Sequence, residues 1–184
     1  MGIQVKELGM GVKLIKRDKF QDYRGYYSEI YSTRTLLENG IVFNCVQDNE
    51  AFSAKKGTVR GIHFQNNPFS QAKMLRCVKG KVFDVAVDLR KESKTYGKYV
   101  SVILEEGDDT FIYIPKGFGH LAVSLVDNTT INYKVDNLYD KHSERSIRYD
   151  DKSIGIVFPN DLENFIVSEK DKNASEFSKC DIDL

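Results

Sequence analysis

Met74-Leu-Arg-Cys-Val78, Lys79-Gly80 and Lys81-Val-Phe-Asp-Val-Ala-Val-Asp-Leu89 follow one another without a break and indicate the fold class. Apolar and polar residues alternate before the Lys-Gly pair, and a β-branched apolar run follows it, which is typical of two short strands. The Lys-Gly pair has the chemistry of a tight turn, because glycine readily adopts positive φ. The stretch therefore predicts a β-hairpin.

Similar strand-like runs recur along the chain. They cover Val12–Lys16, Tyr26–Tyr31, Val42–Asn49, Thr58–Phe64, Tyr99–Leu104, Thr110–Ile114, Leu121–Leu125, Thr129–Val135 and Ser146–Tyr149. Glu106-Gly-Asp-Asp109 and Pro115-Lys-Gly117 predict two further hairpin turns. Strands this short and this frequent predict an all-β, antiparallel barrel or sandwich.

Two segments are predicted to form short helices. Ser32–Gly40 has a capping hydroxyl at its start and a glycine at its end. Ser168–Phe177 begins with a possible serine cap, and its many charges predict a solvated surface.

Composition narrows the class of protein. The chain has 184 residues, with no Pro-rich or Gly-rich linker and no repeat, so we predict one domain over residues 1–184. Lys plus Arg equals Asp plus Glu at 27 each, which favours neither nucleic acid nor a membrane surface as a partner. The three cysteines have no CxxC spacing, and no apolar run is long enough to cross a bilayer. We expect a soluble, cytoplasmic protein.

The segment Arg60-Gly-Ile-His63 and the nearby Lys73 are the first candidates for chemistry. Alternation places Lys73 on the same face as Leu75 and Cys77, where an ammonium group needs an anionic partner. An edge-strand lysine is the plain alternative, and His63 alone is equally typical of a histidine packed in a β core. Arg60 and His63 differ in parity, but a bulge at Gly61 between them can bring both to one face.

Several classes of site fit the sequence poorly. A metal-binding barrel of the HxH type has a second histidine where this chain has Gln65, and a three-histidine site would need His63, His120 and the polar-loop His142 together. We predict no metal. A nucleophile elbow is missing, which disfavours nucleophilic catalysis. Glycine-rich phosphate loops and dinucleotide fingerprints are also missing, so we predict no redox cofactor. Acid/base chemistry remains, with His63 as a base and a tyrosine such as Tyr133 as a proton donor.

A longer set of motifs resembles one known family. These are Phe20-Gln-Asp22-Tyr-Arg24-Gly25, Val46-Gln47-Asp48-Asn49, Gly57–Gln65, Gly80–Arg90, Pro115-Lys-Gly-Phe-Gly-His120, Asn132-Tyr133-Lys134 and Tyr149-Asp-Asp151. In this order, from about residue 10 to Pro159, they resemble the dTDP-4-dehydrorhamnose 3,5-epimerases. The resemblance implies a double-stranded β-helix (cupin jelly roll), a homodimer with an exchanged N-terminal strand, and a reaction without metal or cofactor.

The resemblance also implies roles for catalytic residues. The substrate is a nucleoside diphosphate 4-keto-6-deoxy sugar, whose ketone acidifies the protons at C3 and C5. His63 matches the general base, and Asp151 matches the carboxylate that orients it. Lys73 matches the group that stabilises the enolate oxygen, and Tyr133 matches the acid on the opposite face.

Binding roles follow from the same resemblance. Arg24 and Arg60 match contacts to the diphosphate. The other matching positions are Gln47, Asn49, His120 and Tyr139, together with Phe20 and Glu29, which with Arg24 reach the partner's site in the family. The chain departs from the family at Gly119-His120-Leu-Ala122, where the family commonly has Ala before the histidine and Gly-Phe after it.

Three functions are thus in contention. The first is inversion of both C3 and C5 of a dTDP-linked 4-keto-6-deoxy sugar. The second is a single-centre epimerase acting at C3 or C5 of a related sugar nucleotide. The third, from another class, is a non-catalytic cupin that binds a sugar nucleotide.

Overall fold

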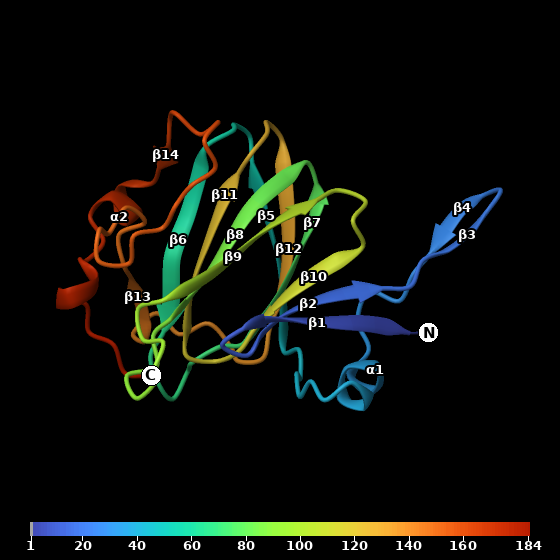
Figure 1. Cartoon of the computed structure of the whole chain (residues 1–184), viewed down its shortest axis with the longest axis horizontal. Helices are drawn as coiled ribbons and strands as arrows, with labels where there is room; N and C mark the ends of the chain where they lie inside the picture. The colour runs from blue at the N-terminus through green and yellow to red at the C-terminus, as the bar shows by residue number, and fades with distance from the viewer. Residues whose placement is uncertain (1) are drawn as a thin grey trace.

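The computed structural model describes residues 2–184 and contains two facing β-sheets of six strands each (Figure 1). The first sheet has the order β1 (Ile3–Gly9), β2 (Val12–Arg17), β10 (Thr110–Ile114), β7 (Lys73–Lys79), β12 (Thr129–Val135) and β5 (Gln47–Ser53). The second has the order β13 (Glu144–Ser146), β6 (Thr58–Gln65), β11 (Phe118–Ser124), β8 (Lys81–Asp88) and β9 (Tyr99–Glu105), with β14 (Ile166–Val167) also paired to β6.

Most connections carry the chain from one sheet to the other. β7 lies in the first sheet and β8 in the second, so the predicted hairpin at Lys79-Gly80 is wrong. The predicted hairpins at Glu106–Asp109 and Pro115–Gly117 are wrong in the same way, since β9 and β11 belong to the second sheet and β10 to the first. Turn residues fix where the chain reverses, but packing decides which sheet the next strand joins. The repeated crossing is the jelly-roll pattern of a double-stranded β-helix, which confirms the predicted fold class.

Three apolar clusters hold these layers together. Residues such as Leu75, Ala86 and Ile112 fill the space between the sheets. The outer face of the second sheet is covered by the C-terminal segment, which contributes Ile147 and Ile182. The outer face of the first sheet is partly covered by α1 (Thr33–Glu38) and the loop after it. The space between the sheets is lined by apolar residues at one end and by polar residues at the other.

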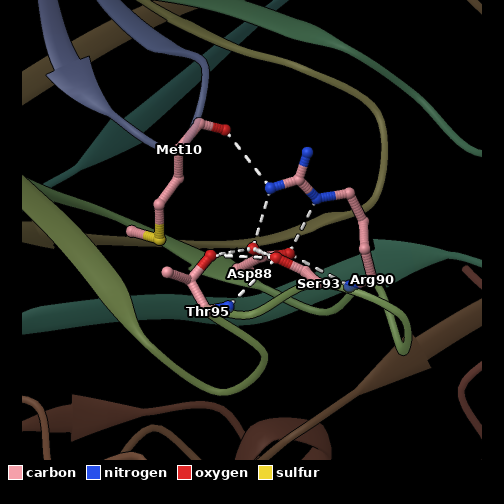
Figure 2. Close-up of polar contacts among 5 residues, drawn as sticks. All are labelled: Met10, Asp88, Arg90, Ser93 and Thr95. Carbon is pink, nitrogen blue, oxygen red and sulfur yellow. Dashed lines mark hydrogen bonds and ion pairs between the residues drawn. The ribbon is translucent and has the colours of Figure 1, made fainter.

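A buried carboxylate ties the loop after β8 to the rest of the fold (Figure 2). Asp88 has no exposed surface and accepts hydrogen bonds from the Arg90 guanidinium at 2.8 Å and from the hydroxyls of Ser93 and Thr95 at 2.6 Å. Burial opposes ionisation, but these donors outweigh it and bring the pKa of Asp88 to about 2. Arg90 also donates to the carbonyl of Met10, so the network joins the β8–β9 loop to the β1–β2 turn.

Two peripheral segments matter for the site. The hairpin of β3 (Phe20–Asp22) and β4 (Gly25–Tyr27) projects from the body of the molecule, on the side away from α2 (Glu169–Lys172) (Figure 1). On the other side, β14, α2 and a 3₁₀ turn at Phe177–Lys179 lie against the second sheet. Over residues 2–184, no helix combines the length and apolar character that crossing a membrane requires.

The predicted elements agree with the structure in the middle of the chain and diverge at its ends. The predicted strands Thr110–Ile114 and Thr129–Val135 are confirmed to the residue, whereas β1 was missed. Ser32 caps α1 by accepting from the Thr35 amide at 3.2 Å, as predicted. Ser168 likewise caps α2, but the predicted Ser168–Phe177 helix is only one turn long, because Ser175 instead forms a parallel bridge with Ile147.

Candidate active site

A pocket of about 580 Å³ opens at the polar end of the space between the sheets. It gathers six of the predicted site residues: Arg60, His63, Lys73, His120, Tyr133 and Tyr139. They come from both sheets and from the loop after β12. The sequence alternation that placed Lys73 beside Leu75 on an inward face is confirmed, since the two are 9% and 0% exposed.

A bulge in β6 brings Arg60 and His63 to the same pocket. Opposite β11, His63 pairs with His120 and Arg60 pairs with Ala122, so β6 has one more residue than β11 between these pairs. The extra residue falls at Gly61-Ile62, and a Cβ on Gly61 would lie 2.3 Å from the carbonyl oxygen of His120. Only glycine allows this close approach of the two strands. The predicted bulge is therefore confirmed.

His63 is held by a carboxylate that the sequence did not point to. Its Nε2 lies 2.6 Å from Oδ1 of Asp171, which is 4% exposed. Burial opposes ionisation of Asp171, but the hydrogen bond and charge of His63 outweigh it and lower the carboxyl pKa. An ionised Asp171 accepts a hydrogen bond from the Nε2–H group, and this leaves Nδ1 as the basic nitrogen.

The predicted pairing of Asp151 with His63 is wrong. Asp151 accepts hydrogen bonds from the amide and hydroxyl of Ser153 and, at 2.8 Å, from the amide of Phe177. It lies in the turn that follows β13, outside the pocket. Asp171 was missed because its neighbours on α2 are charged, and that pattern is typical of a solvated surface.

The wall opposite His63 carries an ammonium group and a phenol. Lys73 on β7 donates to Oε1 of Gln71 at 3.1 Å, and burial lowers its pKa to about 8 despite the charges of Asp136, Asp84 and Glu144. On β12, burial raises the pKa of Tyr133 against the influence of Arg60, so the phenol stays protonated. The pocket thus has a base on the second sheet and donors on the first.

His120 is oriented from within the barrel. Its Nε2 lies 2.8 Å from Oδ2 of Asp84, whose side chain is fully buried in β8. The other oxygen of Asp84 has no hydrogen-bond partner among residues 2–184. Asp84 interrupts the apolar run Val82–Val87, which is a sequence signal of a buried acidic residue. Alternation alone does not single it out.

The pocket mouth carries a further pair that sequence reasoning missed. Glu144 on β13 lies 2.7 Å from the Lys170 ammonium of α2 and accepts a hydrogen bond from the Tyr139 hydroxyl at 3.1 Å. All three side chains line the pocket. The contact joins α2 to β13 across the opening.

The remaining basic and amide candidates occupy the β5 side. Arg60 donates to the carbonyl of Phe52 at 2.7 Å and to the hydroxyl of Ser53 at 3.3 Å, which anchors its guanidinium at the end of β5. Gln47 donates to Asn49 at 2.7 Å. Gln47 and Asn49 lie on the same face of β5 as Ala51, which lines the pocket, so they extend this face beyond the pocket.

Three further predicted residues, like Asp151, Gln47 and Asn49, lie outside the pocket of their own chain. Phe20 and Arg24 are on the projecting β3–β4 hairpin, where Phe20 is half exposed and Arg24 pairs with Asp22 at 2.6 Å. Glu29 accepts a hydrogen bond from the hydroxyl of Thr35 on α1. Within residues 2–184, no group of three or more His, Cys, Asp or Glu side chains is arranged to hold a metal ion.

Comparison with known proteins identifies the family. Residues 9–179 match the family model described as dTDP-4-dehydrorhamnose 3,5-epimerase. The enzyme of that name from Sinorhizobium fredii is 44% identical over 171 residues, which are 93% of this chain and 86% of the relative.

Two solved structures are similar to this chain throughout. The crystal structure of a dTDP-6-deoxy-D-glucose-3,5-epimerase from Legionella pneumophila, in complex with dTDP-4-keto-L-rhamnose, has a TM-score of 0.91 at 34% identity and covers 97% of this chain and 95% of its own. A 3'-monoepimerase from Streptomyces bikiniensis, in complex with dTDP-quinovose, has a TM-score of 0.84 at 31% identity, with 91% and 84% covered. The chain belongs to the dTDP-4-dehydrorhamnose 3,5-epimerase family.

Proposed function

We propose that this protein inverts C3 and C5 of dTDP-4-dehydro-6-deoxy-D-glucose to give dTDP-4-dehydro-L-rhamnose. The observation that carries the proposal is a base and a proton donor on opposite walls of one pocket. His63, with Asp171 behind it, faces the sheet that presents Lys73 and Tyr133. This arrangement suits inversion of a carbon centre, because the proton leaves on one face and returns on the other.

The chemistry follows from the charge that develops during the reaction. The C4 ketone of the substrate makes the hydrogens on C3 and C5 acidic, and Nδ1 of His63 accepts one of them. The electron pair moves to the C4 oxygen, and the Lys73 ammonium stabilises the enolate there. Tyr133 then donates a proton to carbon from the other face, and exchange with solvent deprotonates His63 and reprotonates Tyr133 before the second centre reacts. Asp171 stabilises the imidazolium that forms when His63 takes the proton.

Binding of the diphosphate is assigned to arginines. Arg60 lies in the pocket, and its anchor on β5 holds the guanidinium in place before substrate arrives. Guanidinium groups match phosphate oxygens with paired hydrogen bonds. His120 and Tyr139 line the same pocket and are proposed as further substrate contacts, with Gln47 and Asn49 farther along β5.

The experiment is direct conversion of the dTDP 4-keto sugar, with the product configuration read by proton NMR. We expect a product inverted at both C3 and C5, and little conversion of CDP-linked or GDP-linked analogues at equal concentration. A product inverted at only one carbon supports the hypothesis of a single-centre epimerase instead. Binding without conversion of any of these sugars would leave the non-catalytic cupin.

The single-centre alternative has one observation in its favour. Ala122, two residues after His120, lines the pocket at a position where the family commonly has phenylalanine. The smaller side chain leaves room beside Arg60. The 3'-monoepimerase from Streptomyces bikiniensis shares the fold, so fold alone does not set the number of centres inverted.

We further propose a homodimer in which each β3–β4 hairpin completes the partner's site, each copy acting as one domain over residues 1–184. Within residues 2–184, β5 ends the first sheet with one edge unpaired, and Gln47 and Asn49 lie on that strand. An unpaired edge accepts a strand from another chain. The projecting hairpin would bring Phe20 and Arg24 to it, with Glu29 following. We assign the enzyme to the cytoplasm, in keeping with three free cysteines.

Subunit mixing tests the exchange. Arg24→Ala is expected to lower kcat/KM by roughly 10- to 100-fold through loss of charge-assisted hydrogen bonds, and His63→Ala to inactivate. If Arg24 serves the partner's pocket, a heterodimer of the two variants, purified through two different tags, has one intact site and about half of wild-type activity. A heterodimer no more active than the Arg24→Ala homodimer would place Arg24 in the site of its own chain.

A further inference from the structure

The carboxylate that holds His63 sits on a very short helix. α2 has four residues, and Asp171 is its third. A single helical turn is not stable by itself in water, because nucleation costs more than one or two hydrogen bonds return. The position of Asp171 therefore depends on tertiary contacts, which are the Lys170–Glu144 pair of α2 itself and the anchors of the chain on each side of α2.

Upstream, the chain is fixed to the second sheet. Ile166 and Val167 of β14 run parallel to Thr58 and Val59 of β6, and the Ile166 amide donates to the carbonyl of Gly57 at 2.8 Å. β6 also carries His63, so the N-terminal end of α2 is fixed relative to the strand that holds the proposed base.

Downstream, the chain is fixed to the turn after β13. The amide of Arg148 donates to the carbonyl of Ser175 at 2.9 Å, and the amide of Phe177 donates to Oδ2 of Asp151 at 2.8 Å. The other oxygen of Asp151 accepts from the amide of Ser153 at 2.9 Å. Burial opposes ionisation of Asp151, but these donors lower its pKa. The Phe177 ring then packs on Tyr96, with ring centres 5.1 Å apart.

We propose that Asp151 is a positioning residue for the general base. It clamps the backbone at Phe177, six residues beyond Asp171, and so sets the downstream end of α2 and the 2.6 Å contact between Asp171 and His63. The consequence for turnover rests on the proposed epimerase function. The consequence for the His63 ring does not, because it concerns the protein without substrate.

The physical reason is that the hydrogen bond between His63 and Asp171 depends steeply on the position of Asp171. The bond to Asp171 selects the tautomer with a proton on Nε2 and a free lone pair on Nδ1. When α2 shifts, the ring samples the other tautomer, in which Nδ1 is protonated and cannot act as the base. Misplacement of a catalytic group by about 1 Å reduces rates by roughly 100-fold.

The first measurement is the ¹⁵N NMR signature of the His63 ring in the protein without substrate. We expect the Nε2-protonated tautomer in the wild type and a mixture in Asp151→Ala. Asp150→Ala is the matched control, because its carboxylate forms only a surface pair with Arg148 at 2.8 Å, and it should keep the wild-type signature. An unchanged signature in Asp151→Ala overturns the proposal. Should Asp151→Ala fail to fold, Asp151→Asn, which keeps one acceptor oxygen, takes its place.

The second measurement is a double-mutant cycle with Asp171→Asn. If Asp151 acts through Asp171, Asp151→Ala lowers kcat by roughly 10- to 100-fold with little change in KM, and adds no further loss in the Asp171→Asn background. Equal losses in both backgrounds would mean that Asp151 acts only on the general stability of the fold. If the wild type shows no turnover but Asp151→Ala still shows the expected NMR change, the epimerase proposal is refuted. The proposed role of Asp151 in positioning His63 then still stands.

Discussion

Replacing His63 with alanine is expected to lower the rate of epimerisation by about 10²- to 10⁴-fold, the usual contribution of a positioned general base. The imidazole of His63 is held by the Asp171 carboxylate at 2.6 Å on the second sheet, across the pocket from Lys73 and Tyr133. KM should change little, because His63 contributes to removal of the proton more than to binding. Initial rates measured by NMR at saturating substrate give the comparison.

The control for His63→Ala is the same substitution elsewhere. His142 lies exposed in the loop before β13, outside the pocket, so His142→Ala should keep wild-type turnover. His63 is one-third exposed to the pocket, and its removal leaves no cavity in the apolar core. Its loss leaves the buried Asp171 carboxylate without its histidine partner, so His63→Ala should unfold at a lower temperature than His142→Ala but stay folded at the assay temperature. Substantial turnover by His63→Ala would remove His63 from the role of base.

Replacing Lys73 with methionine is expected to cost about 10²- to 10³-fold in kcat, similar to the loss of one oxyanion donor in other enzymes. Methionine keeps most of the length and apolar stem of lysine but has no charge for the enolate oxygen. Substrate affinity should fall much less, since the enolate forms only after binding. A kcat within a few-fold of the wild type would show that another group stabilises the enolate.

The same residue predicts the pH dependence of turnover at alkaline pH. Burial lowers the pKa of Lys73 to about 8, so the ammonium form is present below this pH and lost above it. Activity should fall as pH rises through about 8, and the residual activity of Lys73→Met should lack this decline. Stability changes in the opposite sense: the unfolded chain binds the proton more tightly, so this group's contribution to the free energy of unfolding increases between about pH 8 and 10.5.

Alternation and turn chemistry predicted the central strands but not their pairing. Lys79-Gly80 marks a true reversal, yet β8 leaves β7 and pairs with β9 and β11. Near-continuous apolar residues make β8 suitable for a position buried on both faces, in the middle of the second sheet. A strand such as β1, mostly exposed at a sheet edge, has no comparable signal.

The site was predictable where it depends on local geometry. The alternation that puts Lys73 on the same face as Leu75, and the glycine between Arg60 and His63, placed three of its groups correctly. The partner of His63 was not predictable in this way, because Asp171 is far along the chain and reaches the pocket only when β14 pairs with β6. Asp151 lies near the same C-terminal segment but acts on Phe177 instead.

The central claim is that protons leave and return by different groups on opposite walls of one pocket. A single turnover of protiated dTDP 4-keto sugar with excess enzyme in deuterated water tests it most directly. The account predicts a product with solvent deuterium at both C3 and C5, because the proton held by His63 is not the one that Tyr133 returns. Protium retained at an inverted carbon would mean that one group removes and returns the same proton, and would contradict the two-sided mechanism.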